Sequence, residues 1–99
     1  MEYLIGIDLG TSGTKTVLFD RLGKVIASAT VEYPMYQERN GWAEQDPLDW
    51  WHASCETLQS VFQQGGVDRR DIKGLGISGQ MHGLVMLDKQ GRVLRRSII

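Results

Sequence analysis

Short apolar and β-branched runs, bounded by polar and turn-favouring residues, recur along the chain, a pattern that predicts strands. Six stretches fit it: residues 3–8, 15–20, 25–33, 72–78, 84–88 and 93–97. Residues 34–44 are predicted to form a loop, because they begin with Pro34 and contain the turn-favouring pair Asn40-Gly41. The strands therefore fall into two groups, one on each side of residues 34–71.

One helix is predicted between the two groups of strands. Asp46 is a suitable N-cap, Pro47 suits the first helical position, and Asp49 adds a negative charge to the first turn. Large apolar residues then recur at three- and four-residue steps, as on one helix face: Leu48, Trp51, Cys55, Leu58 and Phe62. Gly65-Gly66 ends the pattern. The predicted order of elements is β-β-β-α-β-β-β.

Two predicted hairpins share the same turn chemistry. Asp20 and Gly23 stand at the first and fourth positions of one turn, and Asp88 and Gly91 occupy the same positions in another. The flanking residues also match, since four of the ten positions in 17–26 and 85–94 are identical. This similarity is either a short internal repeat or the outcome of two unrelated hairpins that use a common turn.

Composition and charge exclude several classes of function. The 99 residues are 41% hydrophobic and carry a net charge of −1 with no basic block, which gives no electrostatic support to nucleic-acid or anionic-membrane binding. No apolar run approaches the length of a membrane span, and no signal-like segment begins the chain. The single cysteine, Cys55, excludes an internal disulfide and fits a reducing cytoplasm, so a cytoplasmic location is expected.

The segment between the first two strands is the strongest candidate for a functional site. Asp8 ends the first strand, and the turn that follows is built from small and hydroxylated residues: Gly10, Thr11, Ser12, Gly13 and Thr14. Backbone N–H groups and hydroxyls in such a turn can converge on a phosphate, while a carboxylate beside it can hold a cation. An ordinary hairpin turn rich in the same residue types is the alternative.

Two better-known phosphate-binding motifs are excluded by spacing. A Walker loop places four residues between its first glycine and Gly-Lys-Ser/Thr and is followed by a helix, whereas a predicted strand follows Lys15. Residues 74–79 match G-x-G-x-x-G, but they lie within a predicted strand and another strand follows them. Neither segment is a nucleotide fingerprint of those two kinds.

Residues 7–15, Ile-Asp-Leu-Gly-Thr-Ser-Gly-Thr-Lys, resemble the first phosphate motif of the superfamily of sugar kinases, actin and heat-shock-70 ATPases. Within it the chain resembles the amino-terminal end of the FGGY carbohydrate kinases, and specifically the xylulokinases. Three further segments carry the resemblance: residues 42–47 with Trp50-Trp51, residues 76–83 (Gly-Ile-Ser-Gly-Gln-Met-His-Gly), and Leu87-Asp88. The match runs in register over essentially all 99 residues.

The resemblance implies a fold and a domain organisation. The expected fold is the α/β, ribonuclease-H-like amino-terminal domain of that superfamily, with a mixed sheet that is truncated here. Residues 1–99 would be the amino-terminal part of the first kinase domain. The general-base aspartate and the adenosine pocket of such kinases lie further along, so the 99 residues alone are not expected to be active.

The resemblance also implies ATP-dependent phosphorylation of a ketopentose, with D-xylulose favoured, and Mg²⁺ as the metal. Asp8 would hold the Mg²⁺ directly or through water, and Gly10, Thr11, Ser12, Gly13, Thr14 and Lys15 would face the phosphates. Met81 and His82, with Gln80, would bind the sugar. Without the resemblance, a lone histidine such as His82 is more often an ordinary polar residue just past a strand. Such an enzyme is compatible with a homodimer.

Two other functions remain open at this point. The parent protein could phosphorylate another pentulose or a polyol, or it could be a non-catalytic, actin-like ATP-binding domain. Residues 80–83 favour a kinase, because a pure nucleotide switch has no need of a sugar-lining Met-His pair.

Overall fold

The computed structural model describes residues 1–80 and 83–99, and it consists of a sheet with one helix packed on it. The four-stranded sheet has the order β3-β2-β1-β5. Its members are β1 (Tyr3–Leu9), β2 (Gly13–Asp20), β3 (Val25–Glu32) and β5 (Ile72–Gly79). β1, β2 and β3 pair antiparallel in sequence, whereas β5 pairs parallel to β1. The predicted mixed α/β sheet is therefore confirmed.

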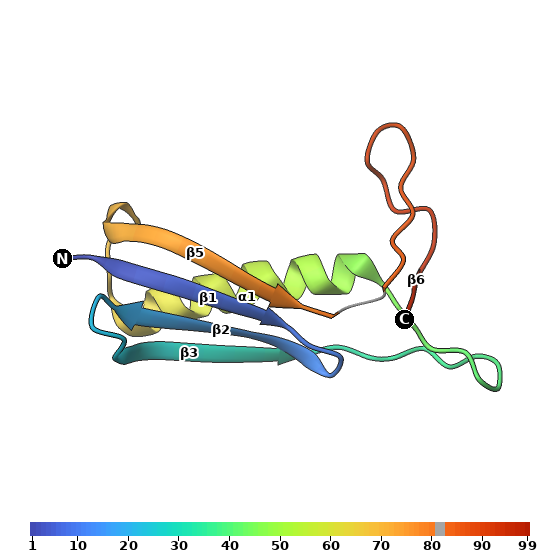
Figure 1. Ribbon diagram of the computed structural model, residues 1–99, viewed down its shortest axis with the longest axis horizontal. Helices are drawn as coiled ribbons and strands as arrows, with labels where there is room; N and C mark the ends of the chain where they lie inside the picture. Colours follow the sequence, from blue (N-terminus) through green and yellow to red (C-terminus); the bar gives the residue numbers. More distant parts are fainter. Residues whose placement is uncertain (81–82) are drawn as a thin grey trace.

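The helix α1 (Pro47–Gly65) lies across β2 and β3 on one face of the sheet (Figure 1). Asp46 caps it by accepting a hydrogen bond from the Leu48 N–H, as the sequence predicts. At the other end Gly66 adopts a left-handed conformation, with φ of 62°, and its N–H bonds to the Phe62 carbonyl. A short 3₁₀ turn, η1 (Arg69–Asp71), then leads into β5.

The core lies between α1 and the covered face of the sheet. It is formed by Ile5, Ile7, Leu18, Ala27 and Val61, which are all buried. One polar contact crosses this core: the hydroxyl groups of Thr16 on β2 and Thr57 on α1 lie 2.7 Å apart, and both residues are fully buried.

The predicted core face of the helix is wrong in part. Ala53, Thr57 and Val61 are the buried residues of α1, whereas Leu48 and Trp51 are 48% and 65% exposed. Hydrophobic periodicity follows the large apolar residues, but close packing of a helix on a sheet favours small side chains at the contact. The large residues consequently lie to one side, where Leu58 and Phe62 only flank the core.

The predicted strands at 84–88 and 93–97 do not form as such. This segment projects from the sheet (Figure 1) and contains only isolated bridges, which join Leu84 to Ile98 and Leu87 to Val93. A two-residue strand, β6 (Ser97–Ile98), pairs with β4 (Glu44–Gln45), a strand at the end of the predicted loop. A hairpin without a third strand or a packed face gains too little to form regular strands.

The two Asp-x-x-Gly turns are nearly identical in the structure. Asp20 accepts hydrogen bonds from the N–H groups two and four residues on, and Asp88 does the same, each at 2.9 Å. Gly23 and Gly91 have φ of 86° and 81°, values that only glycine adopts without strain. In the part of the chain that the structure describes, no helix has the length and hydropathy to cross a membrane.

Candidate functional site

The β1–β2 turn is a tight connection held at several points. The Gly10 N–H donates to the Gly13 carbonyl at 2.9 Å, and the strands then continue in register, with Asp8 opposite Lys15. Gly13 lies so close to β3 that a Cβ atom there would stand 2.7 Å from the Val31 carbonyl oxygen. Gly13, one of the two glycines of the predicted phosphate turn, is thus required by its packing against β3.

Asp8 lies on the face of the sheet opposite α1. Its register neighbours are Lys15 on β2 and Ser78 on β5, so the three residues form a row across the sheet. The Asp8 side chain is exposed and makes no hydrogen bond or ion pair with any residue that the structure describes. The row borders a shallow hollow of roughly 430 Å³ whose floor includes Gly6 and Gly76. The hollow therefore offers one free carboxylate and one cation at its edge.

The carbonyl groups of the turn are bound by three side chains from other elements. The Gly10 carbonyl accepts from the Tyr33 hydroxyl at 2.5 Å and from Gln80 Nε2 at 3.3 Å. The Thr11 carbonyl accepts from Gln45 Nε2 at 2.5 Å. These bonds direct the oxygen side of two consecutive peptides into the protein.

The N–H groups of the same peptides point the other way, because the C=O and N–H of a trans peptide lie on opposite sides. They belong to Thr11 and Ser12, both of which are exposed, and neither N–H is hydrogen-bonded within residues 1–80 and 83–99. Adjacent free N–H groups of this kind form a site for an anion. The turn can therefore bind a phosphate beside the Asp8 carboxylate.

The other predicted phosphate ligands occupy different surroundings. Lys15 is exposed next to Asp8. The Thr14 side chain is fully buried on the α1 face, 3.2 Å from the Tyr33 hydroxyl. The structure thus brings together Asp8, Lys15 and the backbone of the turn, and it separates the Thr14 hydroxyl from them.

The predicted sugar-binding residues follow β5. Gln80 is half-buried, and its amide nitrogen contacts both Gly10 and Gln45. Met81 and His82 lie outside the described residues. Their neighbours Gln80 and Gly83 line a second hollow, of roughly 170 Å³, together with Trp50. This hollow adjoins the turn through Leu9.

One carboxylate, that of Asp8, close to a turn suited to phosphate, fits Mg²⁺ bound together with a nucleotide. Among residues 1–80 and 83–99, no group of three His, Cys, Asp or Glu side chains could hold a metal ion. Mg²⁺ commonly uses only one or two carboxylates and takes its other ligands from phosphates and water. Asp8, a carboxylate unpaired among the described residues and close to the predicted phosphate turn, meets that requirement.

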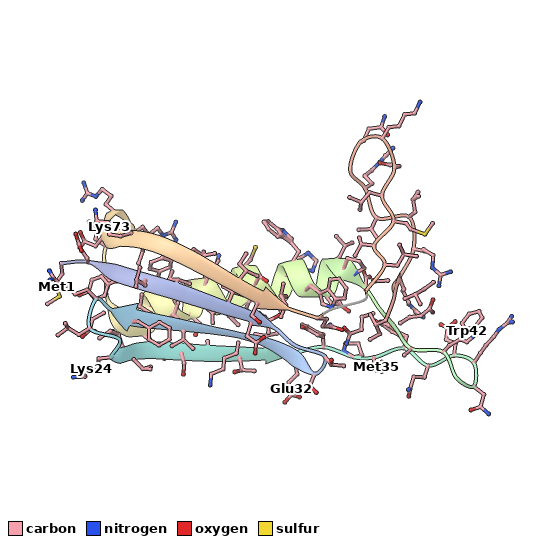
Figure 2. All side chains as sticks on the ribbon, viewed as in Figure 1. Met1, Lys24, Glu32, Met35, Trp42 and Lys73 are labelled. Carbon is pink, nitrogen blue, oxygen red and sulfur yellow. The ribbon has the colours of Figure 1, made fainter. Side chains whose placement is uncertain are left out.

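The sequence does not predict two residues that bind the turn, Tyr33 and Gln45, or Trp50, which binds Gln45. Tyr33 carries no local signal for this role, and Trp50 reads as an ordinary core aromatic residue. Gln45 belongs to segment 42–47, which carries the family resemblance, but nothing in the sequence connects it to the turn. Trp42, in the same segment, lies far out in the loop, where Arg39 packs over its ring (Figure 2).

The chain is similar to known carbohydrate kinases. The family described as "FGGY family of carbohydrate kinases, N-terminal domain" matches residues 3–99. The xylulose kinase of Bacillus subtilis is 48% identical over 99 residues, which are 100% of this chain and 20% of that protein.

Solved structures give the same result. A xylulose kinase from Brucella ovis matches with a TM-score of 0.93 and 37% identity, over 99% of this chain and 21% of its own. A gluconate kinase from Lactobacillus acidophilus matches with a TM-score of 0.88 and 38% identity, over 98% of this chain and 19% of its own. The chain spans about a fifth of the length of these relatives. It belongs to the FGGY family of carbohydrate kinases, whose amino-terminal, actin-like ATPase fold it adopts.

Proposed function

We propose that this chain is the part of an ATP-dependent sugar kinase that binds the transferred phosphate, and that D-xylulose is the acceptor. The observation that carries the proposal is that the Asp8 carboxylate and, a few residues on, the N–H groups of Thr11 and Ser12 are all without partners among the described residues. The identity to xylulose kinases supports the choice of sugar. Gluconate is the second candidate, since a gluconate kinase is also similar over the same region.

In this proposal the residues of β1, of the turn and after β5 have separate roles. Bound Mg²⁺ neutralises charge on the phosphates of ATP, and Asp8 would hold it directly or through water. The Thr11 and Ser12 N–H groups would bind the terminal phosphate oxygens, and Lys15 would add a positive charge beside them. Catalysis of phosphoryl transfer depends mainly on such positioning. Met81 and His82 would contact the sugar, and Gln80 would join the sugar side to the turn.

The substrate is tested with the full-length kinase and a panel of acceptors. ATP-dependent release of ADP is measured with D-xylulose, D-gluconate, glycerol and other pentuloses, and the highest kcat/KM is expected for D-xylulose. A higher value for gluconate or a polyol would refute xylulose as the substrate. ADP binding without turnover on any sugar would point instead to a non-catalytic ATP-binding domain. The isolated 99 residues are expected to show no turnover in this assay.

Asp8→Asn tests the role of the carboxylate in the full-length enzyme. Turnover is expected to fall by on the order of 100-fold or more, because a group that neutralises transition-state charge is lost. The thermal midpoint should not change, since the Asp8 side chain is exposed and has no partner among the described residues. The exposed carboxylate Glu56, on α1, provides the matched control as Glu56→Gln. Equal activity of the two variants would contradict the assignment.

A further inference from the structure

Gln45 is the point at which the turn, the end of β5 and the start of α1 meet. Its side chain is completely buried. Nε2 donates to the Thr11 carbonyl at 2.5 Å, and Oε1 accepts from Trp50 Nε1 at 3.0 Å and from Gln80 Nε2 at 2.8 Å. One buried amide therefore links the phosphate turn to the residue that precedes the Met81-His82 pair.

The neighbours of Gln45 fix the orientation of its amide. Trp50 Nε1 can only donate, so Oε1 must face it, and Nε2 is left to face the Thr11 carbonyl. A side chain here must therefore accept on one side and donate on the other. An apolar residue would leave the Trp50 N–H and the Thr11 carbonyl without partners, which is costly in a buried site.

The Thr11 carbonyl matters because it belongs to the peptide whose N–H is that of Ser12. While Gln45 holds this oxygen inward, the Ser12 N–H stays directed outward. Without the bond, the peptide is free to rotate, and one of the two anion donors is lost. The Gly10 carbonyl would remain bound by Tyr33, so the turn would be altered at a single peptide.

We propose that Gln45 is a positioning residue, which keeps the turn in its phosphate-binding conformation and joins it to the sugar side through Gln80. The inference rests on the proposed function in so far as the anion is the phosphate of a nucleotide. Gln45 itself is buried and does not contact substrate; it acts through the Thr11–Ser12 peptide.

Gln45→Met and Thr57→Val in the full-length enzyme provide the first test. Each removes the three hydrogen bonds of a fully buried polar side chain, but of the two residues only Gln45 contacts the turn. Both variants should have lower thermal midpoints. Gln45→Met should raise the KM for ATP and the Kd for a non-hydrolysable ATP analogue, measured by calorimetry, at least about tenfold, whereas Thr57→Val should leave both within about twofold. Equal nucleotide affinities in the two variants would overturn the proposal.

Gln45→Glu provides a second test that does not depend on Gln45→Met folding. A protonated carboxyl group can donate to the Thr11 carbonyl, whereas a carboxylate only accepts. Affinity for the non-hydrolysable ATP analogue in this variant should therefore improve as the pH is lowered, relative to the wild type at each pH. A flat ratio across the pH range would refute the role of the donated hydrogen bond. Because affinity for the ATP analogue is the readout, the result stands even if no sugar is phosphorylated, which would refute only the proposed function.

Discussion

Among single residues of the turn, Gly13 is the one least able to accept a larger side chain. Gly13→Ala would place a Cβ atom 2.7 Å from the Val31 carbonyl and 3.1 Å from Glu32 Cα, so β2 or β3 must move. We expect a loss of about 1–3 kcal/mol in the free energy of unfolding, measured by urea denaturation. Gly76→Ala is the control, because a Cβ atom at that position would meet nothing within 4 Å. Equal stability of the two variants would contradict this account.

Single residues also show which parts of the site the sequence can predict and which it cannot. Asp8 and the small residues of the turn are identifiable because they are contiguous and chemically distinctive. The side chains that hold the turn are not, since Tyr33 and Gln45 lie 23 and 34 residues from the carbonyl groups that they bind. Such contacts depend on how β3 and β4 pass the turn, and no local pattern encodes that path.

Among the elements, the sequence predicts β1, β2, β3, β5 and α1 nearly to the residue, because apolar runs, turn residues and helix caps act within each segment. It does not predict the face of α1, because Ala53 and Thr57 are buried without being strongly apolar. For residues 84–97 the sequence instead predicts strands that do not form as such. Their apolar runs suit strands, but a strand needs a neighbour, and here the neighbour is only the two-residue β4.

The Asp88 turn should respond to acid. Backbone N–H groups, that of Arg92 foremost, hold the pKa of the Asp88 carboxyl below its usual value. The carboxylate therefore stabilises the turn fully above the ordinary Asp pKa of about 3.9, and this contribution is lost as the pH falls through the lower folded pKa. Amide exchange at Arg92, measured by NMR, should accelerate in that range. Asp88→Asn keeps the acceptor and should show no such transition; a transition of equal size in the variant would exclude Asp88 as its source.

At the scale of the whole molecule, the described chain leaves much apolar surface uncovered. Leu75 and Ile77 on β5 are 50% and 67% exposed on the same face as the core, because α1 covers β2 and β3 but not β5. β5 is also an edge strand in the described sheet. In relatives about five times as long, further chain is available to cover such a surface.

The isolated 99 residues should therefore self-associate. Sedimentation velocity is expected to show a sedimentation coefficient that rises with concentration, since an open apolar edge strand pairs readily with another copy. Ile77→Lys should shift the distribution towards monomer. Leu22→Lys changes an apolar residue that is 86% exposed in the β2–β3 turn, and should have no effect. A wild-type chain that stays monomeric at every concentration would rule out this association.

The buried Thr16–Thr57 contact constrains how these two positions can change over evolutionary time. Thr57 also donates to the Ala53 carbonyl at 2.9 Å, so the hydroxyl hydrogen between the two residues comes from Thr16. Replacing Thr57 first by valine leaves the buried Thr16 hydroxyl without a hydrogen-bond partner. Replacing Thr16 first leaves Thr57 still bonded to the Ala53 carbonyl. An all-apolar pair is therefore reached at least cost through Thr16, and a lineage that loses Thr57 first must cross a less stable intermediate.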